Sequence, residues 1–226
     1  MRHRHKFHAI IPGVDLQALE PFAGQRELRV SSNNGPFVIL QVGTICDRKN
    51  QVLLIRALGE LAQSFPVQDF RVWLAGDVFD EAYAEELRKL VCTLGLESVV
   101  QFLGWRTDVH ELMAKADVLA MPSRDEGVPN TVQEAMAIGL PVAVGAAGGM
   151  PEIVTSGETG WVLNVDDPGE WAKRIQWCYA HRDYCKAIGQ SASVYAFEHF
   201  GTEHWGMEYT RVIETLNMSR PHKGRK

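Results

Sequence analysis

Two glutamates, Glu126 and Glu134, flank a stretch of seven residues. An apolar run precedes this segment, and a helical pattern begins within it. The run at residues 118–121 predicts a buried strand, and the turn after it is rich in Gly and Pro. Asn130 is then expected to cap a helix. This arrangement predicts that Glu126 lies on the loop at the carboxyl end of the strand. Glu134 is predicted to lie about one turn inside the helix.

The segment between the two glutamates has the chemistry of a phosphate site. The first turn of a helix carries backbone N–H groups that lack partners within the helix, and it is the positive end of the helix dipole. A carboxylate on each side of this phosphate site can accept hydrogen bonds from hydroxyl groups. We therefore expect one of the two carboxylates to reach a sugar on one side of bound phosphates and the other to reach a ribose on the other side.

The segment 122–141 resembles the E-x7-E signature of the retaining group 1 glycosyltransferases, which have the GT-B fold. Residues 39–50 resemble that family's first strand and phosphate loop, and residues 118–144 resemble its donor loop and helix. Residues 148–154 and 160–163 resemble the two segments that follow in the family. The resemblance covers residues 8–217. It implies that the chain is the C-terminal half of a GT-B fold, the half that binds the donor sugar nucleotide.

The resemblance also implies which residues contact the donor: Gly43, Thr44, Arg48, Lys49, Gly104, Trp105, Glu126, Gly127, Val128, Asn130 and Glu134. Lys49, six residues after Gly43, is expected to contact the phosphates and support the leaving group. Glu126 is expected to contact hydroxyls of the transferred sugar. Lys49 and Glu126 are thus the two catalytic candidates. The alternatives are a solvated loop lysine and, for Glu134, a carboxylate that only complements the helix dipole.

Three positions qualify the resemblance. Thr44 stands where the family usually has an arginine, which removes one bidentate phosphate contact that Arg48 could replace. Trp105 is expected either to stack on the nucleobase or to pack partly buried. Gly148 and Gly149 allow the backbone to approach a ligand closely, and simple turn glycines are the alternative.

Neither a metal nor a cofactor is expected. The chain contains no Asp-x-Asp motif, so a diphosphate would be neutralised by a lysine, an arginine and a helix dipole. The cluster of His3, His5 and His8 has no neighbouring carboxylate or cysteine to complete a metal site. The four cysteines form no C-x-x-C pair and are expected to be reduced thiols: Cys46, Cys92, Cys178 and Cys185.

Composition narrows the class of protein. The chain has 226 residues, 46% hydrophobic and 23% charged, and its net charge of −5 argues against a nucleic-acid partner. No apolar run approaches the roughly 18–20 residues that span a bilayer, and the N-terminus lacks the core of a signal peptide. The expected location is therefore the cytoplasm. The basic segment 219–226 is expected to be a disordered, solvated tail, with weak attraction to an anionic membrane face as the alternative.

Apolar runs predict strands at residues 37–42, 70–75, 99–103, 118–121, 141–144 and 160–163. Helical spacing predicts helices at 50–65, 80–94 and 109–116, one or two helices over 168–195, and a last helix at 202–216. The alternation predicts an α/β fold with a doubly wound, Rossmann-like parallel sheet, which binds ligands at the carboxyl ends of its strands. The expected divisions are an extension and linker remnant (1–15), the donor-binding domain (16–201), a C-terminal helix (202–218) and the tail.

Two functions remain open. The first is a glycosyltransferase that retains anomeric configuration, with this chain as its donor-binding half. A missing acceptor-binding domain, a partner chain or a second copy would complete it, because only ten residues precede a segment that resembles the family's interdomain linker. The second is a module that binds a sugar nucleotide or regulates a partner without transfer. A nicotinamide-dependent oxidoreductase is disfavoured, because the loop after Gly43 lacks G-x-G-x-x-G.

Overall fold

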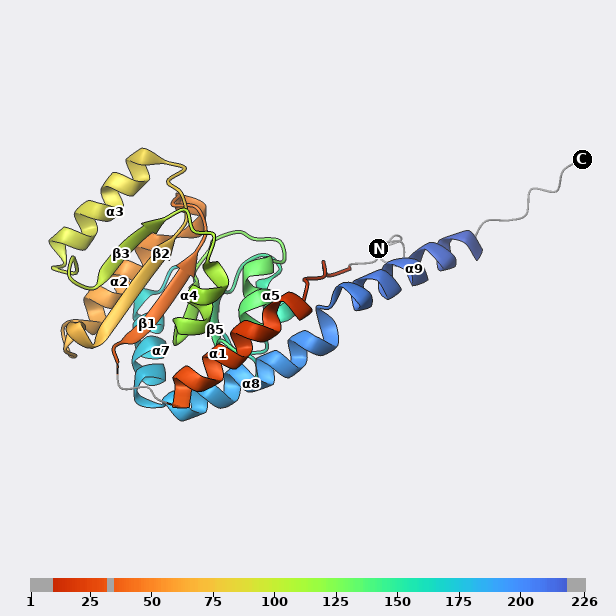
Figure 1. Cartoon of the computed structure of the whole chain (residues 1–226). Helices are drawn as coiled ribbons and strands as arrows, with labels where there is room; N and C mark the ends of the chain where they lie inside the picture. The colour runs from red at the N-terminus through yellow and green to blue at the C-terminus, as the bar shows by residue number, and fades with distance from the viewer. Residues whose placement is uncertain (1–9, 32–34, 219–226) are drawn as a thin grey trace, which may run out of the picture.

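The computed structural model of the chain describes residues 10–31 and 35–218. In this part of the chain six parallel strands form one sheet in the order β3-β2-β1-β4-β5-β6 (Figure 1). The strands are β1 (Phe37–Val42), β2 (Phe70–Ala75), β3 (Val100–Gly104), β4 (Val118–Met121), β5 (Val142–Gly145) and β6 (Trp161–Leu163). The predicted doubly wound, Rossmann-like α/β fold is confirmed, and the predicted strand bounds agree to within one residue.

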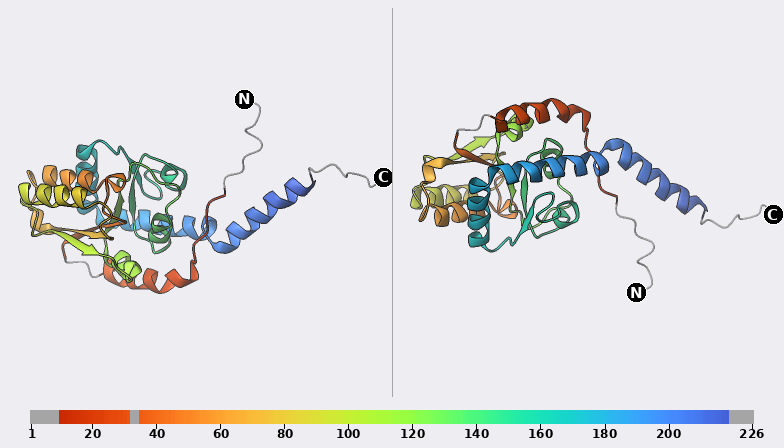
Figure 2. Two further views of the ribbon diagram at one scale, coloured as in Figure 1. Left: turned by 90° about the horizontal axis from the view of Figure 1, so that it is seen from above. Right: turned by 90° about the horizontal axis from the view of Figure 1, so that it is seen from below.

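Helices cover both faces of the sheet (Figures 1 and 2). The helices are α1 (Glu20–Ser31), α2 (Gln51–Leu61), α3 (Glu81–Thr93), α4 (Val109–Lys115), α5 (Asn130–Ala137), α6 (Met150–Ile153), α7 (Pro168–Ala180), α8 (Arg182–His199) and α9 (Thr202–Met218), with short 3-10 turns at Gln17–Leu19, Asp47–Lys49 and Val67–Asp69. The helices α2, α3 and α7 pack on one face. The helices α4, α5 and most of α8 pack on the other, where α1 lies against α4.

The sequence of β1 is almost continuously apolar because both faces of the strand are covered. Phe37 and Ile39 belong to the core on one face, whereas Val38 and Leu40 belong to the core on the other. A parallel strand that is covered on both faces needs apolar residues at successive positions. Gln41 is the exception: it is buried, and its side-chain amide donates to the carbonyl of Lys49 at 2.8 Å.

The helix α1 is absent from the sequence-based prediction. Pro21 and Gly24 weaken the helical pattern, and few apolar residues mark an inner face. A tertiary contact compensates, because the buried Arg26 donates from Nε to the carbonyl of Gly139 at 2.9 Å and from Nη1 to that of Ala116. These carbonyls lie at the ends of α5 and α4, where intrahelical donors are lacking. Arg26 therefore ties three helices together.

The C-terminal helices refine the prediction. The single or double helix expected over 168–195 is two helices, α7 and α8, separated at His181. Beyond them α9 extends away from the sheet and its covering helices (Figures 1 and 2). Three of the four residues predicted on its apolar side, Trp205, Tyr209 and Ile213, are exposed. The basic segment 219–226 and the three N-terminal histidines lie outside the described residues.

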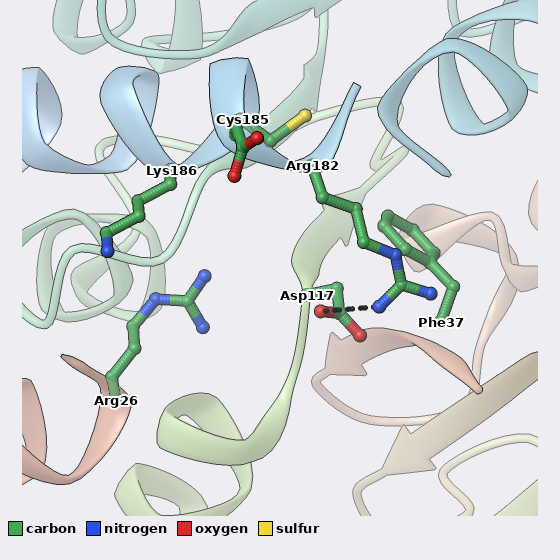
Figure 3. Close-up of a pocket in the computed structure, with 7 residues that line it drawn as sticks. Arg26, Phe37, Asp117, Arg182, Cys185 and Lys186 are labelled. Atoms are coloured by element: carbon green, nitrogen blue, oxygen red, sulfur yellow. Dashed lines mark ion pairs between the residues drawn. The ribbon is translucent and has the colours of Figure 1, made fainter. Parts of the chain in front are cut away.

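A charged hollow lies at the amino ends of β1 and β4, on the edge of the sheet opposite the predicted site (Figure 3). Its volume is about 130 Å³, and its lining includes Arg26, Phe37, Asp117, Arg182 and Lys186. The buried Asp117 accepts the backbone N–H of Val38 at 2.7 Å and pairs with Arg182 at 3.7 Å. The Arg182 guanidinium lies over the Phe37 ring at 5.2 Å. These charges hold the start of the sheet to α1 and α8.

Candidate functional site

The predicted site lies where the sheet changes direction. The chain winds from β1 outward to β2 and β3, then crosses to β4 and continues outward to β5 and β6. The loops that follow β1 and β4 therefore leave adjacent strands toward opposite faces, which opens a crevice at their carboxyl ends. Lys49 lies on the first of these loops and Glu126 on the second.

The loop after β1 depends on glycine. Gly43 has a φ of +143°, and a Cβ atom there would lie 2.9 Å from Cε of Lys49, whose side chain runs across it. The neighbouring loop approaches equally closely, because a Cβ atom at Gly76 would lie 2.1 Å from the Gly43 carbonyl oxygen. Side chains at either position would displace the loop that presents Lys49.

A buried asparagine fixes the end of that loop. Asn50 adopts a left-handed conformation with φ 55°, and its side-chain amide donates to the carbonyls of Pro122 at 3.1 Å and Val165 at 3.0 Å. It therefore links the loops after β1, β4 and β6. The sequence analysis missed Asn50 and Gln41 as site-building residues. The available signals were an Asn directly after Lys49 and a single polar residue inside an apolar strand.

Glu126 is the centre of an ion cluster. Its Oε1 lies 2.6 Å from Nζ of Lys49 and 2.8 Å from Nη1 of Arg48. The side chains of Glu126 and Lys49 are only 11% and 12% exposed, whereas that of Arg48 is 50% exposed. Burial raises the pKa of the Glu126 carboxyl, but the hydrogen bond from Lys49 and the charges of Lys49 and Arg48 outweigh it, so that the pKa is lowered overall.

The Gly148–Gly149 pair holds Glu126 in place. The backbone N–H of Gly149 donates to the carbonyls of Glu126 at 3.0 Å and Gly127 at 3.1 Å. Gly148 has a φ of +58°, and a Cβ atom there would lie 1.8 Å from the Glu126 carbonyl oxygen. The close approach that these glycines permit is therefore made to the loop that carries Glu126.

The start of α5 corrects one prediction. Pro129, not Asn130, is the N-cap, and no side chain caps the helix. Pro129 has an extended conformation with φ −76°, close to the value that its ring imposes, and the helix begins at Asn130, one residue earlier than a capping Asn130 would give. Glu134 lies in the second turn, and its Oε2 is 3.4 Å from Nε2 of His110 on α4.

A cavity of about 350 Å³ opens beside the ion cluster. Its lining comes from the ends of β1 and β2, the loop after β3, the start of α4 and α5: Val42, Gly43, Thr44, Ala75, Gly76, Asp77, Trp105, Arg106, Val109, Thr131 and Glu134. The Gly104 carbonyl accepts the N–H of Gly76 at 2.8 Å, which joins two of these loops. Trp105 is 71% exposed, so the expectation of a partly buried packing role is wrong.

The structure thus places seven of the eleven predicted residues in two adjoining groups. Gly43, Thr44, Trp105 and Glu134 line the cavity. Arg48, Lys49 and Glu126 form the ion cluster, and Lys49 touches the cavity residue Gly43. Gly127, Val128 and Asn130 lie along the connection from the ion cluster to α5 and do not line the cavity.

Among the described residues, no three His, Cys, Asp or Glu side chains gather as they would around a metal ion. The helices in this part of the chain include none with the length and apolar character needed to cross a bilayer. The four cysteines form no disulfide.

Comparisons with known proteins identify the family. The model of the family described as "Glycosyl transferases group 1" matches residues 25–194. The chain is 30% identical over 197 residues to the D-inositol 3-phosphate glycosyltransferase of Corynebacterium kroppenstedtii, covering 83% of this chain and 43% of that protein. The chain spans about half the length of the curated relatives it matches.

Solved structures agree. The crystal structure of Anabaena Alr3699/HepE in complex with UDP superposes with a TM-score of 0.79 at 29% identity, over 93% of this chain and 57% of that one. The C-terminal domain of a group 1 family protein (LpcC) from Francisella tularensis shares the fold at 21% identity and a TM-score of 0.71, over 84% of this chain and 99% of that one. The fold is thus the C-terminal half of a GT-B fold, and the chain belongs to the group 1 glycosyl transferases.

Proposed function

We propose that this chain binds a nucleotide sugar and forms the donor-binding half of a retaining glycosyltransferase. The observation that carries the proposal is the ion cluster of Lys49, Arg48 and Glu126, which adjoins the cavity through Gly43. A diphosphate at this junction would meet two fixed cations, with the carboxylate of Glu126 on one side and that of Glu134 on the other. The solved relative that binds UDP, at 29% identity, supports a uridine nucleotide as the first donor to test.

The proposed chemistry uses charge that is already in place. When the bond between the anomeric carbon and the diphosphate oxygen breaks, its electron pair leaves with the diphosphate. Lys49 and Arg48 would stabilise that charge, because cations fixed in a partly buried site need no reorganisation during the reaction. The acceptor hydroxyl would attack from the same face, and its proton would pass to the leaving phosphate oxygen. Neither a metal nor an enzyme nucleophile is part of this proposal.

Glu126 would recognise the transferred sugar. Because its pKa is lowered, it is ionised at neutral pH and acts only as a hydrogen-bond acceptor. A bound diphosphate would compete with it for Lys49, which would leave carboxylate lone pairs for the hydroxyls of the sugar. A donor that lacks the sugar would lose this contact but keep the phosphate contacts.

A calorimetric titration with UDP-, GDP- and ADP-sugars tests the donor site. Lys49→Ala should weaken binding of the preferred nucleotide by about tenfold or more, as expected for a lost charge-assisted hydrogen bond. Lys89→Ala is the matched control, because Lys89 is an exposed lysine on α3 that pairs with Glu85 on the same helix. If none of the nucleotides binds the unmodified chain, or if the two variants bind equally, the proposal is wrong.

A binding module that does not transfer sugar is the second candidate, since the ion cluster and the cavity would suffice to bind a nucleotide sugar. An acceptor-binding domain, in the same polypeptide or in a partner, would have to complete the enzyme. Co-expression with such a domain separates the two. Sugar transfer that appears only in the mixture favours the split enzyme. Nucleotide binding without transfer under any pairing favours the module.

A further inference from the structure

We propose that His110 is a positioning residue that holds Glu134 ready for the ribose hydroxyls of the nucleotide. This inference rests on the proposed function, because it concerns the same site. It adds a residue from α4 that none of the sequence motifs includes. The contact that suggests it joins Nε2 of His110 to Oε2 of Glu134 at 3.4 Å.

The two side chains meet at the rim of the cavity. Glu134 lines the cavity from α5, and Val109, the residue before His110, lines it from α4. The side chains of Glu134 and His110 are 26% and 36% exposed, so the contact is partly shielded from water. A separation of 3.4 Å is longer than a strong hydrogen bond. The interaction is therefore expected to orient Glu134 rather than to contribute much to stability.

The ring of His110 packs against Phe22 of α1. Its ring centroid lies 5.3 Å from that of Phe22 on α1, with the rings tilted by 51°. The helix α1 is in turn fixed by Arg26, which bonds to the carbonyls of Gly139 and Ala116 at the ends of α5 and α4. The imidazole is thus packed against a helix that is tied to both α4 and α5. Such backing restricts the positions from which Nε2 can donate to Glu134.

Orientation matters because the ribose offers two hydroxyl groups in a fixed geometry. A carboxylate can accept about four hydrogen bonds, so a contact with His110 leaves capacity for both hydroxyls. A free glutamate side chain loses rotamer entropy when a ligand fixes it. A side chain that His110 already orients loses less on binding. The benefit of His110 should therefore depend on the presence of the ribose hydroxyls.

The test pairs two variants with two kinds of nucleotide. His110→Phe keeps a ring against Phe22 but removes the donor, whereas His110→Gln keeps an N–H donor and removes the ring. Each is titrated calorimetrically with UDP, GDP and ADP and with their 2′,3′-dideoxy counterparts. We expect His110→Phe to bind the best ribonucleotide about threefold to tenfold more weakly, as for one modest hydrogen bond, with dideoxy binding unchanged. His110→Gln, which keeps a donor but lacks the ring packed against Phe22, should bind the ribonucleotide more tightly than His110→Phe and more weakly than the unmodified chain.

The outcomes separate the possible roles of His110. An equal loss of affinity for both kinds of nucleotide would assign His110 a general structural role and overturn the inference. Unchanged ribonucleotide binding by His110→Phe would overturn it as well, while leaving the proposed function intact. If the unmodified chain binds none of the three diphosphates, the proposed function fails first and the inference fails with it. The melting temperature of each variant shows whether the fold is retained.

Discussion

The two ends of the sheet each carry a cluster of buried or half-buried charges, and the clusters differ in what their charges contact. At the amino ends, Arg26 donates to carbonyls at helix ends, and Asp117 accepts a backbone N–H and pairs with Arg182. At the carboxyl ends, Lys49 and Arg48 converge on the side chain of Glu126, beside an open cavity. Apart from the pair of Asp117 with Arg182, the first cluster bonds to backbone groups, whereas the second is built on side-chain pairs that a ligand could separate.

Glycine also shapes the carboxyl ends of the strands. Gly43, Gly76 and Gly148 have positive φ values, and each allows a contact at the carboxyl ends that a Cβ atom would block. These glycines allow the loops at this edge to approach one another closely. The ion cluster therefore lies where the loops after β1 and β4 meet, beside the crevice. We infer that the carboxyl-end cluster is suited to binding a ligand, because its charged side chains pair with one another beside an open cavity. The amino-end cluster acts as a structural tie, because Arg26 and Asp117 both bond to the backbone.

The largest effect on stability is expected from Asp117→Ala. The change leaves Arg182 without its carboxylate and the N–H of Val38 without an acceptor in a buried setting. Removing one partner of a buried pair costs about 3–5 kcal/mol, and the lower end applies because Arg182 is partly exposed. Urea denaturation should show this loss in the free energy of unfolding, while nucleotide affinity at the opposite edge stays the same.

The matched control is Asp166→Ala, which removes an exposed carboxylate that pairs with Arg124. A surface pair of this kind contributes about 0–1 kcal/mol. Equal losses of stability in the two variants would contradict a structural role for the amino-end cluster. A loss of nucleotide binding in a folded Asp117→Ala chain would contradict the separation of the two ends.

A smaller loss of stability, with a large loss of binding, is expected from Gly148→Ala. The left-handed backbone alone costs about 1–2 kcal/mol for a residue with a Cβ atom. The added atom would also lie 1.8 Å from the Glu126 carbonyl oxygen, so the loop that carries Glu126 must move. We expect nucleotide-sugar affinity to fall by about tenfold or more, since the loop would no longer place Glu126 beside Lys49.

Gly157→Ala isolates the cost of the backbone. Gly157 has a φ of +86°, but a Cβ atom there would meet no atom within 4 Å. This variant should lose a similar amount of stability and retain its affinity for the nucleotide sugar. Calorimetry on both variants measures the difference. If Gly148→Ala binds as well as Gly157→Ala, the close approach to Glu126 is not needed for the site.

The sequence predicted those parts of the fold and the site that depend on local patterns. Apolar runs located the strands, and the resemblance to the family pointed to Lys49, Glu126 and Glu134 on the loops and helix where they lie. The helix α1 was missed because its stability depends on Arg26, whose carbonyl partners lie 90 and 113 residues away. Local propensity contains no information about such a contact.

The contacts within the site also join residues that are far apart in the sequence, so local patterns could not predict them. That Arg48 faces Glu126, 78 residues away, follows from the way the loops after β1 and β4 meet. The function of Gly148 follows from its approach to the Glu126 carbonyl, and that of Asn50 from carbonyls on two other loops. The residue types of a site can be predicted from a motif. The contacts that hold those residues require the packed sheet.

The smallest expected effect is a dependence of stability on pH that arises from Glu126. Its pKa is lower in the folded chain than the value of 4.5 for an unperturbed glutamate, because Lys49 and Arg48 favour the charged form more than burial disfavours it. A group with a depressed folded pKa stabilises the fold above its unfolded pKa, and this contribution is lost as the pH falls through the folded pKa. The contribution of Glu126 to stability is therefore lost over a pH range that begins near 4.5 and extends to lower values.

Comparison with Glu126→Gln isolates this contribution, because the amide cannot ionise. Urea midpoints of the two chains, measured from about pH 7 to about pH 3, should converge as the pH falls, with the unmodified chain more stable at the upper end. Lys49 should account for most of the difference, since its side chain is 12% exposed and that of Arg48 is 50% exposed and more strongly screened. A difference that stays constant with pH would mean that Glu126 gains nothing from ionisation in the folded chain. The carboxyl-end cluster would then resemble the amino-end one, with Glu126 held by its loop rather than by its charge.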